Sequence, residues 1–127
     1  MKYKIENFQL ENVNEKDILR KFAIPNRAFK HKKPQPGQTI YEYTYKQPKV
    51  TITQDQVFAN GICIGKIKKG SVKRVQNLIN NPDYSYSMAE LTGGSYITNN
   101  LDGEGNLKTY KGKSRVFAKL HIYIKDK

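Results

Sequence analysis

The amino-acid sequence predicts a mostly β protein of the α+β class, a small β-barrel with one or two short helices. Three observations predict it: the chain closes with a strongly alternating segment, its centre holds a tight hairpin signal, and only two short segments show helical spacing. Several short strands joined by turn residues are typical of barrels. A chain of 127 residues is long enough to bury one core. We therefore expect residues 1–127 to form a single domain.

The first third of the chain predicts one strand, one helix and one loop. Residues 2–10 form a weak strand pattern whose apolar phase slips at Glu6, as a β-bulge would cause. Asn14 is placed to cap a helix that runs through Phe22. Residues 30–37 have no periodicity and contain two prolines, so we expect a basic loop there.

The middle of the chain predicts three strands. Residues 39–45 place three tyrosines at alternate positions, and residues 50–53 form a further short strand. Pro48 separates the two because it cannot donate a ladder hydrogen bond. In residues 56–65 the central Asn-Gly pair accepts the positive φ angles of a type I′ turn, which predicts a tight hairpin.

The last third predicts a helix and the closing strand. Ser71 is a good N-cap, and the helical spacing ends at Ile79, before Asn81-Pro82. We expect this helix to pack across the barrel through Val72, Val75, Leu78 and Ile79. Residues 102–106 form a polar turn. Residues 116–124 alternate strictly, which sends one set to the core and the other, beginning at Phe117, toward solvent or a ligand.

The chain is strongly basic, with a formal net charge of +12. Most of its 23 lysine and arginine residues fall in residues 20–49, 66–74 and 108–119, and the last two stretches contain no acid. A compact domain with this charge attracts polyanions and releases their counterions on contact. An acidic membrane surface responds to the same field, but we interpret the charge as a signal for nucleic acid first.

A basic loop between the hairpin and the second helix is one candidate contact with phosphates. Residues 65–71 faintly resemble a phosphate-binding P-loop but lack its lysine after the second glycine, which argues against nucleotide hydrolysis. Backbone N–H groups at a helix start can still hold a phosphate. The alternative is a solvated, charged loop. The candidate cations are Lys66, Lys68, Lys69, Lys73 and Arg74.

The tyrosine row is a second candidate, suited to stacking nucleic-acid bases. Tyr41, Tyr43 and Tyr45 share one face of a predicted strand, with Lys46 and Lys49 at its end. Aromatic rings beside cations are what a sequence-tolerant single-strand binder needs. The alternative is that the tyrosines pack as an ordinary half-exposed sheet face.

Catalytic and metal-binding patterns do not stand out. His31, His121 and Cys63 show no recognised metal spacing, and Cys63 lies in an apolar run typical of a core. The acids form no paired-carboxylate motif. We predict no catalytic residue, no metal and no cofactor, and a protein that is not an enzyme. The single cysteine and the lack of a long apolar stretch favour a cytoplasmic protein without membrane contact.

From about Gly37 to Lys125 the order of these features resembles the HIRAN domain. The matching pieces are the glycine before a strand, the central hairpin, the following helix, a Thr92-Gly-Gly segment and the alternating last strand. The resemblance implies an OB-like barrel of about six strands with one or two short helices and no catalytic activity. In fork-remodelling ATPases this domain captures the 3′ end of single-stranded DNA, whereas stand-alone bacterial and phage members are mostly unexplained.

The resemblance also implies contacts that are only partly present. Family contacts after the hairpin fall on Lys66 and Lys69, but the Asn-Pro-x-Asp segment that holds the terminal nucleotide is replaced by residues 46–52, without an Asp. We therefore expect a module that binds nucleic acid, preferably single-stranded, with no specific reading of a 3′ hydroxyl. The alternative is a mobile-element inhibitor that contacts an acidic or nucleic-acid-loaded protein. The choice of DNA or RNA and the oligomeric state stay open.

Overall fold

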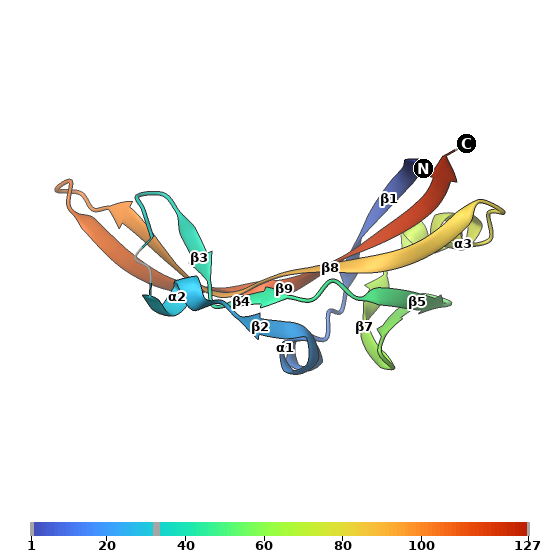
Figure 1. The fold of residues 1–127 in the computed structure, drawn as a ribbon, viewed down its shortest axis with the longest axis horizontal. Coiled ribbons are helices and arrows are strands. Elements are labelled where there is room, and N and C mark those ends of the chain that lie inside the picture. Colours follow the sequence, from blue (N-terminus) through green and yellow to red (C-terminus); the bar gives the residue numbers. More distant parts are fainter. Residues whose placement is uncertain (1, 32–33, 127) are drawn as a thin grey trace.

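One long pair of strands runs through the whole molecule (Figure 1). The computed structural model describes residues 2–31 and 34–126. In it, β8 (Tyr84–Leu101) and β9 (Leu107–Asp126) pair along almost their full length. A barrel is built around one end of this ribbon, and the other end projects from it as a hairpin.

The barrel is closed, antiparallel and six-stranded. Its strands follow the order β8-β5-β6-β7-β1-β9, and the pairing of β8 with β9 completes the circle. The four strands that join the ribbon are β1 (Lys2–Glu11), β5 (Lys49–Thr53), β6 (Gln56–Ala59) and β7 (Ile62–Ile67). The predicted mostly β barrel is confirmed.

Short elements surround the barrel. Strand β3 (Thr39–Tyr41) extends the sheet along β8, while β2 (Ala23–Pro25) and β4 (Tyr43–Tyr45) form a separate two-stranded sheet. The helices are α1 (Glu15–Phe22), α2 (Arg27–His31), the 3-10 turn η1 (Lys69–Ser71) and α3 (Val72–Ile79). No helix of the described residues is long and apolar enough to cross a membrane.

The core is the inward face of this barrel. The alternation predicted for the last strand is confirmed, because every second residue is buried: Val116, Ala118, Leu120, Ile122 and Ile124. Helix α3 contributes Val75, which is fully buried. Val72, Leu78 and Ile79 are partly buried and pack against the core, so the expectation that α3 packs across the barrel through these residues and Val75 is confirmed.

Several local signals are confirmed by the backbone. Asn60 and Gly61 both have positive φ angles, of 50° and 78°, between β6 and β7. Asn14 caps α1 by accepting a hydrogen bond from the amide of Asp17 at 3.4 Å. Ser71 occupies the N-cap position of α3, but its side chain makes no capping bond, because η1 winds into the helix there.

Three sequence expectations differ from the structure. The bulge at Glu6 is absent: β1 pairs with β9 from Lys2 opposite Asp126 to Gln9 opposite Lys119 without a register shift. Residues 30–37 are not a loop throughout, because α2 extends to His31; residues 32–33 lie outside the described part. The tyrosine strand is broken at Glu42 into β3, which pairs with β8, and β4, which pairs with β2.

Strand β8 was not predicted, although it organises the fold. Its buried positions include small or polar residues, Ser87 and Ala89, which give a weak apolar signal. Ser87 is accommodated because its hydroxyl bonds that of Tyr84 at 2.8 Å.

A β-bulge marks the point where the ribbon leaves the barrel. The register of β8 and β9 shifts between Gly93 and Ser95, and Gly93 and Gly94 have φ angles of 102° and 100°. A Cβ atom on Gly93 would lie 2.1 Å from the carbonyl oxygen of Arg115. This position therefore requires glycine.

Candidate functional site

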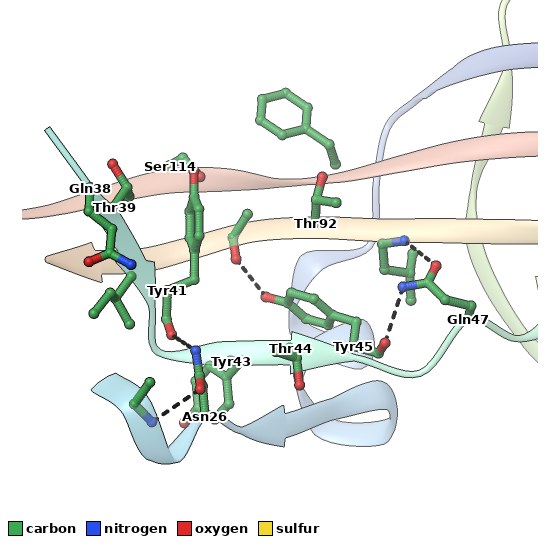
Figure 2. Close-up of a pocket in the computed structure, with 15 residues that line it drawn as sticks. Asn26, Gln38, Thr39, Tyr41, Tyr43, Thr44, Tyr45, Gln47, Thr92 and Ser114 are labelled. Carbon is green, nitrogen blue, oxygen red and sulfur yellow. Dashed lines mark hydrogen bonds between the residues drawn. The ribbon is translucent and has the colours of Figure 1, made fainter. Parts of the chain in front are cut away.

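A groove of about 770 Å³ lies between strands β3 and β4 and the β8–β9 ribbon (Figure 2). Tyr41, Tyr43 and Tyr45 line it, and Phe117 from β9 joins them. The break at Glu42 therefore does not scatter the predicted tyrosine row, because both short strands border the same hollow. Its volume falls in the range of ligand-binding clefts.

Tyr41 and Tyr43 present ring surface to the groove. Tyr41 is 38% exposed, and its ring leans on that of Tyr96 with centroids 5.6 Å apart. Tyr43 is half-buried. A hydrogen bond and the negative charge of the neighbouring Glu42 raise the pKa of Tyr43, so its hydroxyl stays neutral at ordinary pH.

Tyr45 forms the floor of the groove. It is 8% exposed, and its hydroxyl donates a 3.0 Å hydrogen bond to the carbonyl oxygen of Gly93, drawn in Figure 2. Burial raises the pKa of this hydroxyl. This hydrogen bond connects β4 to the bulge in β8. Because the Tyr45 ring is buried, it offers little surface on which a base could stack, whereas the other two tyrosines of the row are more accessible.

The amide side chains of the groove bind the protein's own backbone. Asn26 donates to the carbonyl of Tyr41 at 2.9 Å and accepts from the amide of Ala28. Gln47 accepts from the amide of Leu91 and donates to the carbonyl of Tyr45. These groups position the strands, so the groove offers a ligand aromatic faces and threonine and serine side chains, but not these two amides.

Cations lie beside the groove, and they come from residues that were not predicted from the sequence to be site residues. A neighbouring hollow shares Asn26 and Tyr43 with the groove and is lined by Arg27 and Lys30 of α2. On another side Arg115 flanks Phe117. The same two hollows also carry acids, Glu42 beside Arg27 and Lys30 and Glu11 and Glu15 beside Arg115.

The ten residues predicted from sequence are not brought together. Lys46 is exposed just after β4, whereas Lys49 places its ammonium over the ring of Tyr86, 5.2 Å from the centroid. The remaining cations lie around β7, η1 and α3, toward the opposite end of the molecule from β3 and β4 (Figure 1). They are Lys66, Lys68, Lys69, Lys73 and Arg74.

That second group of cations is partly neutralised. Arg74 forms an ion pair with Glu6 at 2.7 Å, and Lys66, half-buried, lies opposite Glu11 in the ladder between β7 and β1. Lys68, Lys69 and Lys73 are exposed. The group has less free positive charge than its sequence suggests.

The described residues hold no cluster of three His, Cys, Asp or Glu side chains placed to bind a metal ion. His121 bonds Glu90 at 3.0 Å, and Cys63 is half-buried with its thiol near the carbonyl of Gly65. The side chain of His31 lies outside the described part.

Comparison with protein-family models, curated proteins and solved structures found no match to this chain. The HIRAN resemblance rests on its short motifs and stays a prediction.

The structural role of Tyr45 gives a direct prediction. Tyr45→Phe removes the hydrogen bond to Gly93 and is expected to lower the free energy of unfolding by about 1 kcal/mol. Urea denaturation measures the change. Tyr41→Phe is the matched control, since Tyr41 is the exposed member of the row, and it should stay within about 0.5 kcal/mol of the parent. Equal losses in both variants would contradict the role of Tyr45 as the floor.

Proposed function

We propose that this protein is a non-catalytic module that binds nucleic acid, preferably single-stranded, in the groove lined by Tyr41 and Tyr43. The observation that carries the proposal is a ligand-sized groove with open tyrosine faces and cations from α2 on its rim. The net charge of +12 supports a polyanion as the ligand.

The chemistry follows from how a single strand differs from a duplex. Bases in a duplex are already stacked on one another, whereas unpaired bases can lie on a protein ring. Each base stacked on an aromatic side chain contributes about 1–3 kcal/mol and accepts any base, because every base has a π face. In this proposal Arg27 and Lys30 on the rim and the exposed Lys46 after β4 contact phosphates. Each such contact steepens the salt dependence by about 0.7 log units per log unit of salt.

Tyr43→Ala tests the stacking. We expect it to weaken binding of a fluorescent single-stranded oligonucleotide by about 1–3 kcal/mol, measured by anisotropy across a salt series. Tyr110→Ala is the matched control, because Tyr110 is an exposed tyrosine that does not line the groove. A loss of melting temperature without loss of affinity would show that Tyr43 only packs, and would contradict the proposal.

End specificity is a further consequence of the proposed mode. The groove's amides are occupied by backbone groups, so oligonucleotides with a free and a phosphate-blocked 3′ end should bind nearly equally. Strong discrimination between the two ends would instead favour the terminal-nucleotide pocket that the HIRAN resemblance implies.

A second candidate function is contact with a protein, as in an inhibitor from a mobile element. The observation that favours it is the apolar tip of the β8–β9 hairpin, where Leu101 and Leu107 face each other and are both exposed. If single-stranded oligonucleotides fail to bind even at low salt, this second candidate becomes the better account.

A further inference from the structure

A second aromatic cluster lies on the outer face of the barrel, apart from the groove. Tyr86 of β8 and Tyr123 of β9 stack with centroids 4.4 Å apart and planes 9° apart. Tyr3 of β1 meets both rings edge-on, at 6.1 Å and 6.0 Å. We call these three residues the tyrosine cluster.

The tyrosine cluster is partly open to solvent, since Tyr86 and Tyr123 are half-buried and Tyr3 is exposed. Tyr3 is 38% exposed, and Ile5, directly opposite Tyr123 in the ladder, is 50% exposed. Helix α3 does not cover this face: it reaches β1 through the ion pair of Arg74 with Glu6. Glu6 points to the face of β1 opposite to Ile5, because side chains alternate along a strand.

Most charges around the tyrosine cluster are positive. Lys49 lies over the ring of Tyr86, and Lys125 is the ladder partner of Tyr3. By alternation Lys119 shares the outer face of β9 with Tyr123. On the same face Glu90 is paired with His121. Rings beside cations are the combination that binds single-stranded nucleic acid.

The same face of β9 leads from the groove to the tyrosine cluster. Phe117, which lines the groove and is 46% exposed, alternates on that face with Lys119, His121 and Tyr123. The ladder with β8 is unbroken from Thr92–Phe117 to Tyr86–Tyr123. Six residues of strand span about 20 Å, a distance that a short single strand can follow.

We infer that the tyrosine cluster is a second subsite for the same single strand, which leaves the groove at Phe117 and continues along the outer face of β9. Bases stack on the accessible ring surface of the tyrosine cluster, while Lys119 and Lys125 contact the intervening phosphates. Lys49 leaves the Tyr86 ring for a phosphate when a base takes its place. This inference rests on the proposed function.

The test compares a short and a long ligand. Oligothymidylates of about 4 and about 16 nucleotides, the limits of site size for one OB fold, are titrated into the full chain with anisotropy as the readout. We expect the longer one to bind more tightly. Tyr86→Leu, which keeps apolar packing but loses the stacking face, should weaken the 16-mer by about 5- to 150-fold and leave the 4-mer within about twofold.

The controls separate the two proposals. Tyr110→Leu makes the same chemical change on an exposed tyrosine away from the tyrosine cluster and should leave both affinities unchanged; melting temperatures verify that each variant folds. A 16-mer affinity unaffected by Tyr86→Leu would overturn the second subsite while leaving the groove intact. Failure of wild type to bind either ligand would overturn both. Sedimentation that shows self-association abolished by Tyr86→Leu, with 16-mer binding intact, would assign the tyrosine cluster to a contact between copies.

Discussion

Gly93→Ala is expected to destabilise the protein by at least about 3 kcal/mol. Two costs add at this position. The φ angle of 102° lies in a region that residues with a Cβ atom rarely adopt, and the added atom would sit 2.1 Å from the carbonyl oxygen of Arg115. That oxygen belongs to the backbone of β9, so it cannot move without disturbing the ladder between β8 and β9.

Urea denaturation of Gly93→Ala measures this loss. Gly103→Ala is the control: Gly103 lies in the hairpin turn, and a Cβ atom there meets nothing within 4 Å. It should change the free energy of unfolding by no more than about 0.5 kcal/mol. A Gly93 variant as stable as the Gly103 variant would mean that the ribbon leaves the barrel without this bulge.

Leu120→Ala is expected to cost about 2–5 kcal/mol of unfolding free energy. Leu120 is fully buried in the centre of β9, so its removal leaves a cavity among residues held by neighbouring strands. Leu78→Ala makes the same chemical change on α3, where the side chain is only partly buried. It should cost less than half as much, because some of that surface already meets water.

Chemical denaturation of both leucine variants, with the slope compared to confirm two-state behaviour, provides the measurement. Comparable losses would show that α3 packs more deeply than its exposure indicates. A small loss at Leu120 would contradict the position of β9 in the core.

Much of the fold could be predicted because its signals are local. The alternation of β9, the Asn60-Gly61 turn and the limits of α1 and α3 depend on neighbouring residues alone. The break of the tyrosine strand at Glu42 could not be predicted in this way. It depends on the pairing of β3 with β8 and of β4 with β2. Both pairings join residues that are distant in sequence.

The site was predictable to a similar extent. The tyrosine row was visible as an alternation, and it does line a groove. Which tyrosine forms the floor depends on the bulge at Gly93 and was not visible. The tyrosine cluster contains one ring from each of three strands, so no pattern of neighbouring residues in the sequence predicts it. Lys49 was singled out beside the row, yet its strand places it over Tyr86.

The pairing of β1 with β9 has a consequence for how fast the protein folds. Lys2 lies opposite Asp126, so one of the pairings that make the barrel joins residues at opposite ends of the sequence. Bringing such residues together lowers the conformational entropy of the chain before the contacts between them have formed. Domains dominated by pairings between distant residues therefore fold in milliseconds to seconds. During synthesis the edge of β1 that pairs with β9 stays unpaired until β9 has been made. In that period such a chain is most exposed to aggregation.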